Sequence, residues 1–149
     1  MKILLALDGS KFSEAATNIV ITQIKAKDTK VHLLHVVDPF PARLAGNKGS
    51  QETPDFVAAR LEQRDYAKEL LSRATEKLRS AGFEVTSAVE EGDARDAILN
   101  HAERWRADLI VVGSHGRKGL DRFLIGSVSE AVARHARCSV EIVRIRPAN

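Results

Sequence analysis

Apolar residues along the chain alternate between two spacings. Five short runs are dense in β-branched and aliphatic residues, which is typical of strands, and they lie at Lys2–Leu7, Val31–Val37, Phe83–Val89, Asp108–Val112 and Val140–Ile145. Between these runs, apolar residues recur every three or four positions, the spacing of one face of an α-helix. The helical stripes begin at Phe12, Ala67, Ala94 and Val128. The pattern predicts strands that alternate with helices along the whole chain.

Residues at the helix ends agree with this pattern. Ser10 is placed as the N-cap of the first helix, because its hydroxyl can accept a free backbone N–H. Thr53 and Pro54 predict the start of the second helix, and Gly82 predicts its end. Strands that alternate with helices form parallel sheets covered on both faces. We therefore expect an α/β fold, a single doubly wound domain over residues 1–149 with a five-stranded parallel sheet.

The predicted strands differ in how continuously apolar they are. The first and fourth runs are almost wholly apolar, as central strands covered on both sides should be. The runs at Phe83–Val89 and Val140–Ile145 contain charges and alternate more, so we place them nearer the edges. Residues 38–54, with three prolines and two glycines, predict a long loop. Loops of such length are commonly functional or mobile.

Composition narrows the class of protein. Of the 149 residues, 44% are hydrophobic and 29% are charged, a balance typical of globular chains. The net charge is only +3, and the basic excess lies in residues 113–149, where seven Lys and Arg face three Asp and Glu. Such a local excess suits a phosphate-bearing ligand better than a nucleic acid. Apolar runs are too short for a membrane span, and the single cysteine, Cys138, favours a reducing compartment. We expect a cytoplasmic protein without nucleic-acid or membrane partners.

Two predicted strand ends carry candidate chemistry. Ligands of open α/β sheets bind beyond the carboxyl ends of the strands, where the strand order reverses. Asp8-Gly9-Ser10 follows the first strand, and a glycine-rich stretch that starts at Gly113 follows the fourth and leads to Gly126-Ser127 at a helix start. Glycines let a backbone approach a ligand closely, and the free N–H groups of a helix N-terminus favour an anion. Positive charge is added within this stretch by Arg117, Lys118 and Arg122. The sequence predicts a phosphate site that is neither a Walker loop nor a dinucleotide fingerprint.

These motifs resemble the universal stress protein family, and in particular its ATP-binding branch. The resemblance rests on Gly113-x2-Gly116-x9-Gly126-Ser127, on Ile3-Leu4-Leu5-Ala6-Leu7-Asp8-Gly9-Ser10 and on Leu34-His35-Val36-Val37-Asp38, and it covers nearly the whole chain. It implies a Rossmann-like sheet in the strand order 3-2-1-4-5. It also implies a cytoplasmic homodimer that binds ATP, together with Mg²⁺, and acts as a regulatory or stress-response protein with little or no turnover.

The resemblance further implies roles for individual residues. Ala6, Leu7 and Asp8 would lie against adenine and ribose, and Val36 would meet the edge of the base through its backbone. Val112 and Gly113 would contact the ribose side. The residues that would hold the phosphates are Gly116, Gly126, Ser127 and Val128, with Arg117 supplying charge beside them.

Two alternatives of other classes remain open. One is a slow ATPase or phosphotransferase that uses Asp8 and the loop cations. Efficient catalysis also needs a placed base, and no second carboxylate is evident near the phosphates. The other is a nucleotide-independent interaction module. Asp8 itself has a simpler interpretation, as a turn residue that bonds the backbone of Gly9 and Ser10.

The histidines give no metal or catalytic pattern. His115 is expected to be an exposed loop residue. His32 and His35 are three residues apart on one strand, so they face opposite sides of the sheet and form no metal pair. Trp105 falls on the buried stripe of its helix, and Cys138 is expected to be buried or half-buried.

The final strand predicts how copies of the chain assemble. An edge strand exposes unpaired N–H and C=O groups, and two copies that pair antiparallel close into a dimer. We therefore expect a homodimer through residues 140–145. Two departures from the family bear on this edge: Ser139 stands where many members have proline, and Glu141 stands where the family is usually apolar.

Overall fold

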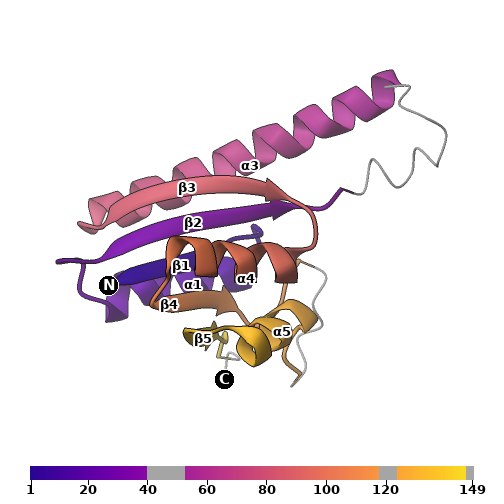
Figure 1. Cartoon of the computed structure of the whole chain (residues 1–149). Helices are drawn as coiled ribbons and strands as arrows, with labels where there is room; N and C mark the ends of the chain where they lie inside the picture. Colours follow the sequence, from indigo (N-terminus) through magenta and orange to yellow (C-terminus); the bar gives the residue numbers. More distant parts are fainter. Residues whose placement is uncertain (40–52, 118–123, 147–149) are drawn as a thin grey trace.

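The computed structural model describes residues 1–39, 53–117 and 124–146 (Figure 1). The strands are β1 (Lys2–Ala6), β2 (Lys30–Val37), β3 (Glu84–Glu91), β4 (Leu109–Gly113) and β5 (Ser139–Val143). The helices are α1 (Lys11–Gln23), α3 (Pro54–Ser80), α4 (Ala94–Trp105) and α5 (Ser127–His135). The long loop predicted over residues 38–54 falls, at residues 40–52, outside the described part of the chain.

The strands form one parallel sheet in the order β3-β2-β1-β4-β5. This confirms the predicted α/β class and strand order, and it confirms β3 and β5 as the edges. The strand order reverses between β1 and β4, because the chain builds outward to β2 and β3 on one side and to β5 on the other. The carboxyl ends of β1 and β4 are therefore the place where this fold accommodates a ligand.

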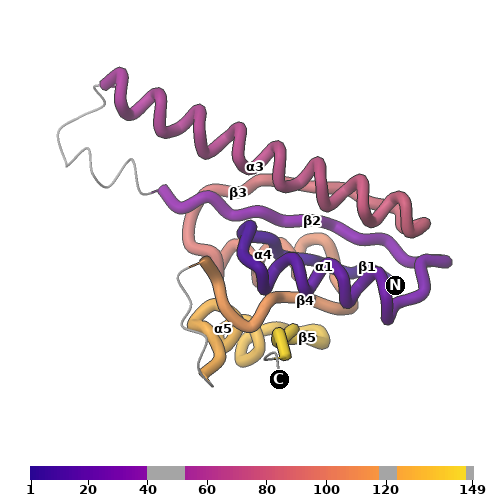
Figure 2. The backbone as a smooth tube through the Cα atoms, turned by 180° about the vertical axis from the view of Figure 1, so that it is seen from behind, coloured from indigo at the N-terminus to yellow at the C-terminus, as the bar shows by residue number. Residues whose placement is uncertain are grey.

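Helices cover both faces of the sheet, α1 and α3 on one and α4 and α5 on the other (Figures 1 and 2). Alternate residues of each strand point to opposite faces, so Ile3 and Leu5 pack toward α1 and α3 while Leu4 packs toward α4 and α5. All three are fully buried. The two apolar layers hold β1 and β4 rigidly side by side.

The helix starts confirm the capping predictions. The Ser10 hydroxyl accepts the Ser13 N–H at 3.2 Å, and the Thr53 hydroxyl accepts the Phe56 N–H at 3.2 Å. The start of α4 is capped by Asp93, which accepts from Arg95 and Asp96. The N-cap of α5 is Gly126, which has no side chain to offer. Among the described helices, α5 is thus the one whose first turn lacks a side-chain cap.

The predicted strand ends are shifted by one or two residues. The clearest correction is the last strand, predicted over Val140–Ile145 but observed over Ser139–Val143. Its neighbour sets this limit, because β4 ends at Gly113, which pairs with Val143, and Ile145 has no strand beside it. The third strand likewise begins after Phe83, whose N–H still bonds Leu78 at the end of α3.

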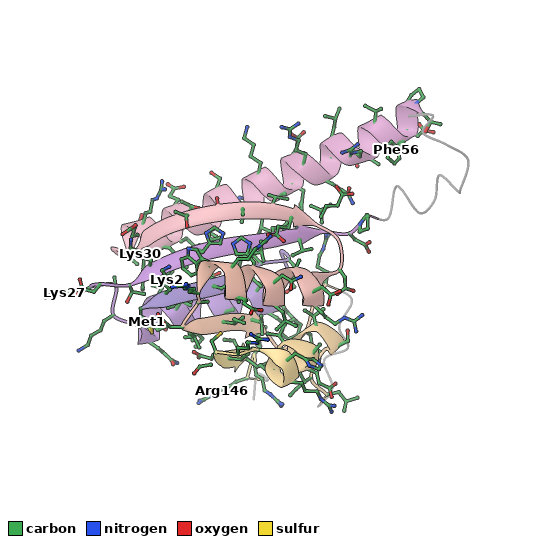
Figure 3. All side chains as sticks on the ribbon, viewed as in Figure 1. Met1, Lys2, Lys27, Lys30, Phe56 and Arg146 are labelled. Carbon is green, nitrogen blue, oxygen red and sulfur yellow. The ribbon has the colours of Figure 1, made fainter. Side chains whose placement is uncertain are left out.

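The two ends of the sheet differ in charge and in how far the helices extend. Figure 3 places Met1, Lys2 and Lys30 at one end and Phe56 at the other, where α3 runs past the strands. Lys2 and Lys30 begin β1 and β2, so these cations lie at the amino ends of the strands, away from the candidate site. Within the described residues, no helix has the length and low charge needed to cross a membrane.

Candidate functional site

The turn after β1 is organised by the Asp8 carboxylate. Its Oδ1 accepts the Ser10 N–H at 2.9 Å, which fixes the turn into α1. Its Oδ2 accepts the Arg117 N–H at 3.1 Å, which reaches across to the loop after β4. The bond to Ser10 is the one expected of a turn residue. The second bond goes beyond it, because it joins two segments 109 residues apart.

The loop after β4 is held by main-chain bonds that centre on Ser114. The buried Ser114 N–H donates to Val143 at 2.8 Å, and its carbonyl accepts the Gly126 N–H at 2.7 Å. Ser129, in the first turn of α5, donates its hydroxyl to the carbonyls of Gly113 at 2.8 Å and Ser114 at 3.2 Å. These bonds fix the N-terminus of α5 beside the end of β4.

The three glycines of the motif are required by different neighbours. A Cβ on Gly113 would lie 2.7 Å from the Phe12 backbone, so this glycine permits the packing of α1 against β4. This packing is a second reason for glycine at position 113, beside the predicted approach of a ligand. A Cβ on Gly126 would lie 3.0 Å from the Ser114 carbonyl oxygen. A Cβ on Gly116 would also lie 3.0 Å from its nearest neighbour, which is Asp8 Oδ2. Gly116 is therefore the glycine that faces the turn after β1.

The first turn of α5 begins at the solvent-exposed Ser127 and carries Ser129 into the interior. Ser127 is exposed, and neither it nor Gly126 caps the helix with a side chain. Free N–H groups and the helix dipole give this end a partial positive charge. The first acidic residue of the helix, Glu130, forms an ion pair with Arg134 at 2.9 Å.

The predicted apolar site residues pack into the apolar layers of the sheet, with the side chains of Leu7 and Val112 buried and the others half-buried. Ala6, Val36, Val112 and Val128 all pack in the apolar layer under α4 and α5. Leu7 packs on the opposite side, and its carbonyl accepts from His35 Nδ1 at 2.7 Å. Because these side chains face the core, a ligand at this edge would contact their backbone groups.

Tyr66 is a residue of this region that the sequence did not indicate. It comes from the middle of α3, and its hydroxyl donates to the Asp8 carbonyl at 3.1 Å. Gly9 has a φ of +81°, and a Cβ there would lie 1.6 Å from the Tyr66 oxygen. The glycine after Asp8 was the available signal, since a position that excludes a side chain implies a close neighbour.

Of the side chains in the loop after β4, Arg117 lies at the surface and His115 does not. Arg117 is exposed, with its guanidinium carbon 4.9 Å from the centroid of the Tyr66 ring. Lys118 and Arg122 lie outside the described residues. His115, predicted to be an exposed loop residue, is half-buried instead. Its ring packs 5.0 Å from the Phe12 ring, centroid to centroid, and its Nε2 is buried without a hydrogen-bond partner in the described structure, because α1 covers this side of the loop.

A second group of polar side chains lies between the sheet and α4, and extends from the amino end of β2 to the carboxyl end of the edge strand β3. We call His32, Thr86, Glu90, His101 and Trp105 the histidine cluster. His32 and His101 stack with ring centroids 4.6 Å apart, and His32 Nδ1 lies 2.6 Å from Thr86 Oγ1. His101 Nδ1 lies 2.6 Å from Glu90 Oε1, and Trp105 packs 5.3 Å from His32.

The structure confirms the predictions for His32, His35, Trp105 and Cys138. His35 faces α3 and Tyr66, on the side of the sheet opposite to His32. Trp105 packs as predicted, and Cys138 is half-buried. Burial, followed by the nearby His101, lowers the pKa of His32, while Glu90 opposes this shift. The hydrogen bond from His101 is the main cause that lowers the pKa of Glu90. Within the described residues, no group of three His, Cys, Asp or Glu could hold a metal ion.

The fold and this strand-end geometry define a doubly wound α/β protein with an anion-favouring helix N-terminus at its switch point. The model of the universal stress protein family matches residues 1–144. Universal stress protein MJ0531 of Methanocaldococcus jannaschii is 33% identical over 143 residues, which cover 96% of this chain and 81% of that relative. The chain belongs to the universal stress protein family, which confirms the resemblance.

Solved structures agree with this assignment. The structure of the hypothetical protein MJ0577 is 28% identical with a TM-score of 0.84, and the match covers 99% of this chain and 97% of that chain. A universal stress protein in complex with cAMP is 25% identical with a TM-score of 0.66, and the match covers 97% and 96% of the two chains. This chain thus shares its fold with a universal stress protein that was solved in complex with cAMP.

Proposed function

We propose that this protein binds ATP, together with Mg²⁺, at the carboxyl ends of β1 and β4, and that it acts as a regulatory protein with little or no turnover. The observation that carries the proposal is the bond from the Arg117 N–H to Asp8 Oδ2. This bond brings the two predicted motifs together at the switch point of the sheet, where nucleotides bind in doubly wound folds. The complex of a related protein with cAMP supports an adenine nucleotide as the ligand.

Asp8 keeps acceptor capacity for the ribose. An ionised carboxylate offers about four acceptor positions, and the N–H groups of Ser10 and Arg117 use two of them. The remaining positions can accept ribose hydroxyls. The backbone of Ala6, Leu7, Val36, Val112 and Gly113 would then border the base and sugar, as predicted.

The phosphates belong at the uncapped start of α5. Gly116, Ser127 and Val128 supply backbone N–H groups for them, the Ser127 hydroxyl is exposed, and Gly126, whose own N–H bonds the Ser114 carbonyl, holds the helix start in place. Such a helix end binds anions through its free donors and its dipole. Mg²⁺ is commonly held by phosphates and few carboxylates, and Asp8 is the carboxylate that meets this loop in the described structure.

The described residues favour binding over turnover. Phosphoryl transfer to water or a hydroxyl needs a group that orients the nucleophile. Asp8 is assigned to the ribose and Mg²⁺ in this proposal, and the first acidic residue of α5, Glu130, is paired with Arg134. A slow ATPase is the alternative, and measurement of phosphate release separates the two.

The proposed site is tested by Gly116→Val. A Cβ at this position would lie 3.0 Å from Asp8 Oδ2, so valine displaces the carboxylate and fills the space between the two loops. We expect ATP affinity, measured by calorimetry, to fall by about tenfold or more, the loss of at least one charge-assisted bond. Ser87→Val, which adds the same side chain on the exposed edge of β3, is the control and should leave ATP affinity unchanged. Equal affinities would place the nucleotide elsewhere.

We further propose a cytoplasmic homodimer formed through β5. Val143 bonds Ser114 of the β4 side through its carbonyl, and the N–H and C=O of one strand residue point to the same side. The neighbouring Ile142 therefore directs its N–H and C=O to the open edge. Ile142→Pro removes a donor from that edge and should shift the protein to monomers in sedimentation. An unmodified protein that sediments as a monomer with and without ATP would overturn the dimer.

A further inference from the structure

The side chain of Arg117 already has a partner in the ligand-free fold. Its guanidinium carbon lies 4.9 Å from the centroid of the Tyr66 ring, within the range of a cation–π contact. Arg117 follows Gly116 in the proposed phosphate loop, whereas Tyr66 belongs to α3. The contact therefore connects the proposed nucleotide site with a helix that the family motif does not include.

Tyr66 is held firmly in this position. Its hydroxyl donates to the Asp8 carbonyl at 3.1 Å, and the His35 ring lies against it with centroids 5.9 Å apart. The turn after β1 is shaped around it, because a Cβ on Gly9 would overlap the Tyr66 oxygen. The tyrosine ring is thus a fixed platform, and the exposed Arg117 side chain is the partner that can move.

The backbone and side chain of Arg117 are fixed to different degrees. Its N–H is held by Asp8 Oδ2 at 3.1 Å, which keeps the residue at the mouth of the proposed site. The guanidinium, in contrast, rests on an aromatic face in contact with solvent, which is one of the weaker interactions of an arginine. Guanidinium pairs with phosphate oxygens are charge-assisted and bidentate, and they are considerably stronger.

We propose that Arg117 exchanges partners: it stacks on Tyr66 when no nucleotide is bound and moves to the phosphates when ATP binds. The proposal rests on the proposed function and specifies how the site distinguishes a phosphorylated nucleotide from adenosine. The Tyr66 hydroxyl keeps its bond to the Asp8 carbonyl, so the exchange removes the contact of α3 with the loop after β4 and leaves its contact with the turn after β1. α3 is also the helix that runs past the sheet and exposes Val57 and Leu61.

The chain has a single tyrosine, which makes the contact directly observable. Protein labelled with ¹³C in tyrosine gives one set of ring signals by NMR. Arg117→Ala should shift these signals in the ligand-free protein, and ATP should shift those of the unmodified protein in the same direction. Adenosine, which lacks phosphates, should not reproduce the ATP shift. Ring signals unaffected by Arg117→Ala would show that the contact is not formed, and an adenosine shift equal to that of ATP would show that phosphates do not release it.

Affinity measurements test the exchange independently. Tyr66→Leu removes the aromatic platform, so ATP should bind about two- to fivefold more tightly, the factor that corresponds to an exposed cation–π contact. Tyr66→Phe keeps the ring and should bind ATP as the unmodified protein does. Arg117→Ala should lower ATP affinity about tenfold and leave adenosine affinity unchanged. Arg64→Ala removes an exposed arginine from α3, the helix that contains Tyr66, and is the control for the loss of a positive charge.

The outcomes separate this proposal from the proposed function. Weaker ATP binding by Tyr66→Leu, with circular dichroism showing an intact fold, would mean that the ring orients Arg117 for the phosphates and would overturn the exchange alone. ATP binding that is equal in Arg117→Ala and Arg64→Ala would also overturn the exchange while the site itself stands. Absence of ATP binding to the unmodified protein would overturn both.

Discussion

The strand-end site and the histidine cluster are both polar regions at the sheet, yet they are built from different groups. At the strand ends the partners are backbone atoms: Asp8 accepts two N–H groups, and the start of α5 leaves its own donors exposed. In the histidine cluster, side chains bond one another, and His101 and Arg104 both engage Glu90. The first region leaves a helix start without a side-chain cap, whereas the second bonds most of its polar groups internally, with His32 Nε2 buried and unpartnered within the described residues.

This difference indicates separate roles for the two regions. Free N–H groups at a helix start attract a phosphate, so changes at the strand ends should affect binding more than stability. Side chains that stack and bond within the cluster join β2, β3 and α4, so changes there should affect stability and leave binding intact. Each prediction below would separate the two regions or show that they are coupled.

The largest expected effect is on ATP binding by Ser127→Asp at the start of α5. Two like charges about 4 Å apart at an effective dielectric of about 20 repel by roughly 4 kcal/mol, so we expect ATP affinity to fall by about 100-fold or more. Stability should be unchanged or rise by about 0.5 kcal/mol, because an acidic residue suits a helix N-terminus. Calorimetry and urea unfolding measure the two effects.

The matched control is Ala94→Asp, at the first position of α4. It adds the same charge to the same kind of helix position, but after the edge strand β3 and not after β1 or β4, and should leave ATP affinity unchanged. If Ser127→Asp bound ATP about as tightly as this control, the phosphates would not bind at the start of α5.

The next effect is on stability, by Trp105→Ala in the histidine cluster. The half-buried indole packs on His32, and Lys2 Nζ lies 5.1 Å from its ring centroid. Truncation of a fully buried tryptophan costs about 3–5 kcal/mol, so the half-buried ring should contribute roughly 2 kcal/mol to the free energy of unfolding in urea. Trp105→Phe should restore part of this. A loss of ATP affinity in a folded Trp105→Ala protein would show that the two regions are coupled.

The smallest expected effect is the dependence of stability on pH. His32 has a lowered pKa in the folded protein, so the unfolded chain binds its proton first as pH falls. The stabilisation is therefore complete above the ordinary histidine pKa of 6.5 and is lost as pH falls from there toward the folded pKa. Glu90 acts in the same direction at lower pH, because its pKa is lowered from 4.5.

We expect the free energy of unfolding to decrease as pH falls below 6.5, and His32→Val to make that decrease shallower. Urea unfolding of both proteins at a series of pH values measures this. His35→Val, on the opposite face of the same strand, controls for loss of a histidine. Equal slopes for His32→Val and the unmodified protein would show that another group dominates the pH dependence.

The sequence was sufficient to predict the elements, because local signals determine them. Two hydrophobic spacings gave the strands and helices, and the hydroxyls of Ser10 and Thr53 marked helix starts. Strand ends were less predictable, since they depend on where the neighbouring strand stops. Strand β5 ends at Val143 because its partner β4 ends at Gly113. This limit follows from the pairing of the two strands and cannot be read from either segment alone.

The candidate site was predictable in part. Glycine spacing and the strand-end rule indicated both loops, but the contact between Tyr66 and Asp8 joins residues 58 positions apart and leaves no local pattern. The exposure predicted for His115 was wrong for the same reason, because the burial of its ring depends on Phe12 of α1. The need for glycine at position 113 likewise arises from packing against α1, which motif spacing does not reveal.

The most direct test of the account is a calorimetric titration of the full chain with Mg-ATP, combined with measurement of phosphate release from the same sample. The account predicts saturable heat with one nucleotide per chain, weaker binding of ADP and AMP, and no release over multiple turnovers. Steady multiple-turnover release would contradict the regulatory role and support an ATPase. Absence of heat at any nucleotide concentration would contradict ATP binding and support a nucleotide-independent interaction module.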